Sequence, residues 1–209
     1  MARGSPIPNV SAPGQLGPTV LDTATPVRVS VVGTSCCGKT TFARELAAVL
    51  GTAHVELDPL YWLPNWVERS PEDFRAHVSK AVANESWVID GNYSKSRDIV
   101  WGRATHVIWL NYSFPVIWWR AISRTVRRAI SGEELFSGNR ESWRRVLLSH
   151  DSMIIWVLAT FRHNRVKYRA LRQSSEWQHI DFQEFNNSAQ TAEFLARLGA
   201  SEAEEEERE

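Results

Sequence analysis

Residues 33–41 read Gly-Thr-Ser-Cys-Cys-Gly-Lys-Thr-Thr and fit the phosphate-binding pattern G-x-x-x-x-G-K-[ST]. In such a loop, successive backbone N–H groups point at phosphate oxygens, and the helix that follows adds positive potential. Lys39 would reach the β- and γ-phosphates, and the Thr40 hydroxyl would bind Mg²⁺. We therefore expect a nucleoside triphosphate to be bound by a run of successive residues: Gly33, Thr34, Ser35, Cys36, Cys37, Gly38, Lys39, Thr40 and Thr41.

Two carboxylates follow short apolar runs that we expect to be strands. Asp90 closes the run 87–89, and an aspartate in this place holds Mg²⁺ directly or through water in loop-type nucleotide-binding proteins. Asp58 closes the run before it, where a carboxylate could take a proton from a substrate hydroxyl or bind that hydroxyl. Asp58 could equally be a turn residue ahead of a proline. Trp62 could stack on a flat substrate or could simply pack.

Arginines at three- and four-residue spacing would lie near one broad face of a helix: Arg120, Arg124, Arg127 and Arg128. Phosphoryl transfer spreads negative charge over oxygens that the protein must neutralise, so this helix could close over the phosphates as a lid. The alternatives are a solvated basic face and a nucleic-acid surface. Nearer the strand ends, Asn92 and Arg97 are candidates for contacting a phosphate acceptor.

Strand-like and helical patterns alternate along the chain. The expected strands span 27–32, 54–58, 86–90, 106–110 and 177–182. The expected helices span 42–50, 71–84, 94–101, 114–130, 140–172 and 190–198. This alternation predicts an α/β fold with a parallel sheet covered by helices on both faces. Ligands bind such sheets at the carboxyl ends of the strands, where the loop, Asp58 and Asp90 all fall.

The composition fits one domain flanked by tails. The chain has 209 residues, 43% of them hydrophobic, and a formal net charge of zero, so overall charge indicates no particular partner. We expect a disordered leader over 1–26, a domain over 27–199 with a basic helical lid region over about 120–172, and a disordered acidic tail over 200–209. The sequence shows neither a secretory signal nor a membrane span, and adjacent cysteines rarely bridge. We therefore expect a reduced, cytoplasmic setting.

These features together resemble the P-loop nucleoside and nucleotide kinases of the adenylate-kinase-like family, and within it the bacterial DNA topology modulation proteins. The matching stretches are the loop, residues 54–66, residues 87–93 and the arginine-rich segment, so that the resemblance covers about 27–198. It implies a three-layer α/β/α P-loop NTPase fold with a five-stranded parallel sheet and an arginine-rich helical lid.

The same resemblance implies ATP and Mg²⁺ as cofactors. Lys39 and Thr40 would then contact the ATP phosphates and the metal, Asp90 would contact the metal, and Arg124 and Arg128 would be lid arginines.

The chain departs from the family in two places. The family's loop usually has Gly-Ser where Cys36 and Cys37 stand here, so Cys36 occupies a place that favours glycine and could strain the loop. Cys37 lies near a helix start and a lysine and could be redox-sensitive. The simpler interpretation is that both cysteines are small residues that fill positions in the loop. Adenylate kinases follow Asp-Gly with Phe-Pro-Arg, whereas residues 92–94 are Asn-Tyr-Ser, so the resemblance does not specify AMP as the acceptor.

The sequence thus predicts an ATP-dependent kinase that moves the γ-phosphate of Mg-ATP to a small-molecule acceptor, with nucleosides and nucleotides as first candidates. The expected catalytic residues are Lys39, Asp58, Arg124 and Arg128, and the expected acceptor contacts are Asp58, Trp62, Asn92 and Arg97. A second hypothesis is a nucleotide-dependent regulatory ATPase whose basic helices bind DNA, and a third is nucleotide binding without useful turnover. We expect no membrane partner, and a monomer or homodimer.

Overall fold

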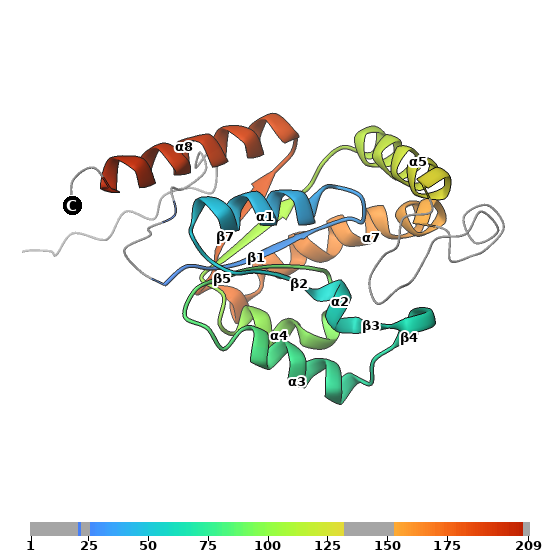
Figure 1. The fold of residues 1–209 in the computed structure, drawn as a ribbon, viewed down its shortest axis with the longest axis horizontal. Coiled ribbons are helices and arrows are strands. Elements are labelled where there is room, and N and C mark those ends of the chain that lie inside the picture. The colour runs from blue at the N-terminus through green and yellow to red at the C-terminus, as the bar shows by residue number, and fades with distance from the viewer. Residues whose placement is uncertain (1–20, 22–25, 132–152, 207–209) are drawn as a thin grey trace, which may run out of the picture.

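A five-stranded parallel sheet forms the centre of the molecule (Figure 1). The structure is a computed structural model that describes residue 21 and residues 26–131 and 153–206. Its strands run in the order β2-β5-β1-β6-β7, with bounds β1 Arg28–Gly33, β2 His54–Glu56, β5 Trp87–Asp90, β6 His106–Leu110 and β7 Asp181–Phe185. The register pairs Val31 with Asp90 and Gly33 with Leu110, so the carboxyl ends of the central strands meet at one edge. The predicted five-stranded parallel sheet is confirmed.

Helices on both faces complete three layers. One face carries α1 (Lys39–Val49) and α8 (Ser188–Glu206), and the other carries α3 (Pro71–Ala81) and α4 (Arg97–Trp101) (Figure 1). Valines of β1 are buried on both sides: Val31 packs with the α1 and α8 layer, and Val32 with the α3 and α4 layer. Burial on both faces explains why the run 27–32 shows no alternation of apolar and polar residues.

Two further helices lie on either side of residues 132–152 in the sequence. These are α5 (Phe114–Ser131) and α7 (Met153–Gln173), which pack against each other and contribute Ile117 and Phe161 to the core. They contain the described parts of the expected basic lid region, and residues 132–152 of that region lie outside the described residues.

The second strand is shorter than the sequence predicts. β2 ends at Glu56, and Asp58 lies in a short helix, α2 (Leu57–Tyr61), rather than at a strand end. Pro59 is compatible with this helix because the N–H that proline lacks would be unpaired in a first turn. The expected loop after it contains a small antiparallel hairpin, β3 (Trp62–Leu63) and β4 (Val67–Glu68), joined by the 3₁₀ turn η1 (Pro64–Trp66).

The last strand and the last helix also differ from the prediction. The run 177–182 was expected to be a strand, but Trp177 closes the 3₁₀ turn η4 (Ser175–Trp177), and β7 begins at Asp181. Trp177 packs edge-on against Trp101, with the ring centroids 5.3 Å apart, which favours the turn over an extended chain. α8 continues to Glu206, so the described part of the expected acidic tail, 200–206, is helical, a conformation that alanine and glutamate favour.

Little of the expected leader is described. Within 1–26 the structure describes only Leu21 and Pro26, and the side chain of Leu21 is buried in the core that includes Val29 and Leu46.

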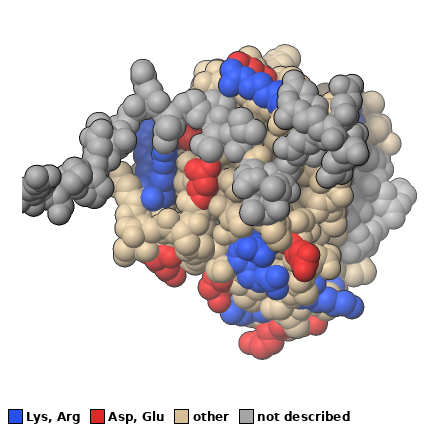
Figure 2. Space-filling view, turned by 90° about the vertical axis from the view of Figure 1, so that its left-hand side faces the viewer, with Lys and Arg blue, Asp and Glu red and all other residues tan. Residues whose placement is uncertain are grey.

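Among the described residues, no helix has both the length and the apolar character that crossing a membrane requires. On the face shown in Figure 2, the described acidic and basic side chains are interspersed, in keeping with the net charge of zero.

Candidate active site

The phosphate-binding loop joins β1 to α1, as the sequence predicts, and its geometry requires both glycines of the pattern. Gly33 has φ of 152°, and a Cβ there would lie 2.7 Å from the carbonyl oxygen of Leu110. Gly38, with φ of 99°, precedes the first residue of α1 in a left-handed conformation that side chains disfavour. The loop is therefore closely packed on β6 at one end and turned sharply into a helix at the other.

The two cysteines of the loop have different environments. Cys36 has φ of 65°, a left-handed conformation that is uncommon outside glycine, so the expected backbone strain is present. Cys37 is fully buried, and this burial raises the pKa of its thiol despite the opposing positive charge of Lys39. A buried neutral thiol is a poor nucleophile. Packing is therefore the better interpretation of Cys37.

Thr40 and Asp90 meet directly across the loop. The Thr40 hydroxyl donates a hydrogen bond to Oδ2 of Asp90 over 2.7 Å, and Nε2 of His54 lies 3.1 Å from Oδ1. Asp90 is buried, so these two partners hold its carboxylate in one orientation. A hydroxyl and a carboxylate are oxygen ligands of the kind that Mg²⁺ uses together with nucleotide phosphates, so the residues present fit that ion. The sequence did not single out His54 for this role.

Cations from α1 and α5 converge on the same loop. Nζ of Lys39 lies 3.3 Å from the Thr34 carbonyl oxygen, where it donates a hydrogen bond. Arg120 of α5 donates from Nη1 to the Cys37 carbonyl oxygen over 2.7 Å, and its guanidinium lies 5.2 Å from the ring centroid of Tyr112.

The sequence had favoured Arg124 and Arg128 as lid cations. Among the described residues, Arg120 is the arginine of α5 that donates a hydrogen bond to the loop. It is the first of the four spaced arginines and the one nearest the strand end, which is the signal that could have selected it.

Asn92 fastens the start of the loop from the opposite side. Its Oδ1 accepts hydrogen bonds from the Gly33 N–H over 3.2 Å and from the Tyr168 hydroxyl over 2.9 Å, and its Nδ2 donates to the Gly33 carbonyl oxygen. The side chain is thus bonded to the loop and to α7. In this structure Asn92 positions the loop, and its contact with an acceptor stays a prediction.

Solved structures provide the comparison with known proteins, since no family model and no curated protein matches the sequence. A shikimate kinase from Acinetobacter baumannii, in complex with shikimate, aligns over 83% of this chain and 91% of its own, with a TM-score of 0.53 and 14% identity. The chain has the fold of a P-loop kinase. A gluconokinase from Sinorhizobium meliloti aligns over 88% of this chain and 95% of its own, with a TM-score of 0.49 and 16% identity.

Asp58 lies in α2, which follows β2, and its side chain is exposed. Tyr93 orients its carboxylate. The Tyr93 hydroxyl donates to Oδ1 of Asp58 over 2.7 Å. Burial, and then the negative charge of Asp58, raise the pKa of Tyr93, so Tyr93 remains a proton donor to that carboxylate. Trp62, half-buried in the hairpin, packs edge-on against Tyr61 and Trp66 with centroid separations of 5.1 and 5.6 Å.

Arg97 lines a narrow cavity together with Ser30 and Val32 of β1 and with residues that follow β5. Gly91, Asn92 and Tyr93 form one wall of this cavity, and Arg97 lies over the Trp101 ring, with Cζ 5.6 Å from its centroid. Gly91 has φ of 146°, and a Cβ there would lie 2.8 Å from the side chain of Leu57. Asp58 thus lies in α2, which follows β2, and Arg97 begins α4, which follows β5 after the 3₁₀ turn η2 (Ser94–Ser96). Trp62 belongs to an aromatic cluster, and contact of these three side chains with an acceptor stays a prediction.

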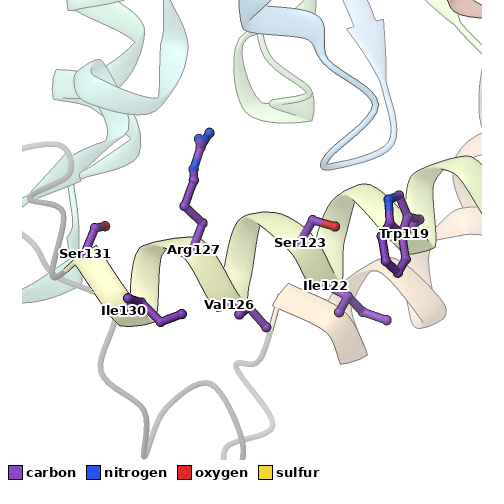
Figure 3. Close-up of a pocket in the computed structure, with 7 residues that line it drawn as sticks. All are labelled: Trp119, Ile122, Ser123, Val126, Arg127, Ile130 and Ser131. Carbon is purple, nitrogen blue, oxygen red and sulfur yellow. The ribbon is translucent and has the colours of Figure 1, made fainter.

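A larger pocket of about 470 Å³ lies on α5 and contains no residue of the loop. Figure 3 shows that Ile122, Val126 and Ile130 project to one side of α5, and that Arg127 projects to the other. Because its described lining is largely aliphatic and one-sided, we assign this pocket no part in catalysis.

Proposed function

We propose that this chain is an ATP-dependent phosphotransferase that moves the γ-phosphoryl group of Mg-ATP to a hydroxyl of a small-molecule acceptor. The observation that carries the proposal is the hydrogen bond of 2.7 Å between Thr40 and Asp90, located at the end of a correctly formed phosphate-binding loop. The P-loop kinase fold supports it as an analogy of architecture.

In this proposal each residue of the loop side has a distinct task. Backbone N–H groups of residues 33–40 bind the phosphates, and Lys39 neutralises the β- and γ-phosphate oxygens. Thr40 and Asp90 would hold Mg²⁺, which would supply positive charge to the phosphates of ATP. Arg120 and, one turn further along α5, Arg124 neutralise the charge that develops on the transferring group.

On the acceptor side, Asp58 accepts the proton of the attacking hydroxyl. The hydroxyl oxygen forms the new bond to the γ-phosphorus, the bond to the β,γ-bridging oxygen breaks, and ADP leaves with that electron pair. Tyr93 holds Oδ1 of Asp58, which directs the carboxylate and leaves Oδ2 for the acceptor.

Two classes of acceptor have support. Nucleosides and nucleotides follow from the resemblance to adenylate-kinase-like proteins and to the DNA topology modulation proteins. The neighbouring kinase structure instead holds shikimate, so small hydroxy acids belong in the same test.

The test is a screen of nucleosides, nucleotides, sugars and hydroxy acids with purified protein, ATP and Mg²⁺, read by product mass. We expect one class to gain a single phosphoryl group in wild type and none in Lys39→Ala. ATP consumption without any phosphorylated acceptor, stimulated by DNA and weakened steeply by salt, would instead support the regulatory ATPase. ATP consumption unchanged in Lys39→Ala would contradict both.

A further inference from the structure

Exposed apolar side chains gather on two helices that pack against each other. Among the described residues, nine large apolar side chains are exposed: four on α5, four on α7 and one in the hairpin. Scattered exposed apolar residues are normal on a protein surface, whereas a contiguous group marks a surface that another molecule covers. On α5 this group also lines the pocket of about 470 Å³ described above (Figure 3).

The exposed side chains of α5 form one stripe along the helix. At intervals of three, four, three and four residues the exposed positions are Val116, Trp119, Ser123, Val126 and Ile130. These intervals keep side chains on one face of a helix, and a stripe with this spacing is the kind that packs along a second helix. The exposed fractions of Trp119 and Ile130 are 70% and 74%, so no described residue covers the stripe at these positions.

The stripe has almost the same order from either end, with Ser123 in the middle. Val116 lies seven residues before Ser123, and Ile130 lies seven residues after it. In a pair of α5 helices that run in opposite directions about a two-fold axis at Ser123, each Val116 would therefore face Ile130 of the second copy. Trp119 would fall between Val126 and Ile130 of the second copy, so the side chains would interleave. The small side chain of Ser123 would let the helices approach closely where they cross.

Charge favours this antiparallel arrangement over a parallel one. α5 contains four arginines and no acidic residue, so a parallel pair would set each arginine beside its own equivalent. In the antiparallel pair, Arg127 would lie at the level of Trp119 of the second copy, and Arg124 at the level of Ile122. A guanidinium on an indole face is a favourable contact, and this fold already contains one between Arg97 and Trp101.

We propose that two copies of this chain form a dimer through the exposed stripe of α5, packed antiparallel about a two-fold axis at Ser123. A lipid surface would accept an apolar stripe in any order, whereas the order on either side of Ser123 fits the same helix reversed. The dimer requires no phosphotransferase activity. The hydrogen bond from Arg120 to the phosphate-binding loop lies outside the stripe and stays intact.

Sedimentation velocity of the full chain measures the association. One helix pair is smaller than a standard interface of about 800 Å² per partner, so we expect a dimer that dissociates between about 1 and 100 μM. Trp119→Ala should raise the dissociation constant about tenfold or more, and Val126→Ala should raise it in the same direction. Val67→Ala, at a similarly exposed valine of the hairpin, is the matched control and should leave it unchanged.

Two results of this measurement would overturn the proposal. One is a monomer at every concentration, whether the stripe is then free or is covered by residues 132–152 of the same chain or by another molecule. The other is a dimer whose dissociation constant is the same in wild type, Trp119→Ala and Val126→Ala, because such a dimer would use a different surface.

Cross-linking tests the direction of the helix pair. Ser123→Cys should form a disulfide-linked dimer under mild oxidation, because both copies present this position at the axis. Val116→Cys and Ile130→Cys should each fail to link with themselves and should link to each other when mixed, as read by peptide mass. The controls are Ser79→Cys, at an exposed serine of α3, and the wild type with its two native cysteines. Linking of Val116→Cys to itself, with no link in the mixture, would show a parallel pair and overturn the proposed arrangement.

Discussion

Arg120 donates a hydrogen bond from Nη1 to the main-chain oxygen of Cys37 over 2.7 Å, and so joins α5 to the phosphate-binding loop. A Cβ on the next residue, Gly38, would lie 3.2 Å from the same nitrogen. The glycine and the arginine therefore depend on each other, because the absence of a side chain at Gly38 leaves room for the guanidinium beside the loop.

Replacing Arg120 should slow phosphoryl transfer more than it weakens ATP binding. We expect Arg120→Ala to lower kcat by about 10²-fold, the loss typical of one preorganised donor to a transition-state oxygen. Arg120→Lys should be intermediate, because it keeps the charge and loses the planar fork. Steady-state kinetics with the acceptor found in the screen provide the measurement. Arg162→Ala, an exposed change on α7, is the control, and an equal loss in that variant would argue against a specific role.

The contact between Thr40 and Asp90 predicts the Mg²⁺ requirement. We expect Thr40→Val and Asp90→Asn to raise the Mg²⁺ concentration needed for tight ADP binding, and Thr40→Ser to preserve it, because serine keeps the hydroxyl. His54→Ala should raise it by about tenfold, since residues that orient a metal ligand typically matter by 10–100-fold. Calorimetric titration of ADP at several Mg²⁺ concentrations measures this directly. Indifference of Thr40→Val to Mg²⁺ would exclude the hydroxyl as a ligand.

Asn92 should matter for stability as well as for nucleotide binding. Asn92→Ala leaves the Gly33 N–H and carbonyl without their side-chain partner, and we expect a loss of about 1–3 kcal/mol in the free energy of unfolding. Urea denaturation measures it, with Asn84→Ala, at an exposed position, as the matched control. Tyr168→Phe removes one bond of the same group and should cost less. A KM for ATP unchanged in Asn92→Ala would show that the hydrogen bonds between Asn92 and Gly33 do not order the loop.

Cys36 is the residue at which a substitution should stabilise the protein. Its φ of 65° suits glycine, so Cys36→Gly should be neutral or should raise the free energy of unfolding by up to about 1 kcal/mol. Cys36→Val should lower it, because a β-branched side chain disfavours the left-handed region. Denaturation midpoints of the three proteins give the order, and a valine variant as stable as the glycine variant would contradict the conformational explanation.

The sequence predicted those parts of the site that depend on neighbouring residues. The loop from Gly33 to Thr41 is encoded by spacing that only strand, turn and helix satisfy, and Asp90 follows from the strand that it ends. Asp58 was placed at a strand end because an apolar run gives no sign that a helix one turn long begins at Leu57.

Contacts between distant segments were less accessible. Asn92 bonds Tyr168 across 76 positions, and Arg120 bonds Cys37 across 83. Spacing alone does not distinguish Arg120 from Arg124. Only the position of Arg120 nearest the end of β6 could have selected it, and its distance from the loop depends on where α5 begins.

Gly91 and Leu57 together give a criterion for finding relatives of this chain. A Cβ at Gly91 would lie 2.8 Å from the side chain of Leu57. A side chain can therefore be introduced at position 91 only if a smaller residue replaces Leu57. Whole-chain identity of 14% to a protein of the same fold is too low to guide such a search. A paired constraint on two residues that face each other across the acceptor side can recognise shared geometry in sequences that have otherwise diverged.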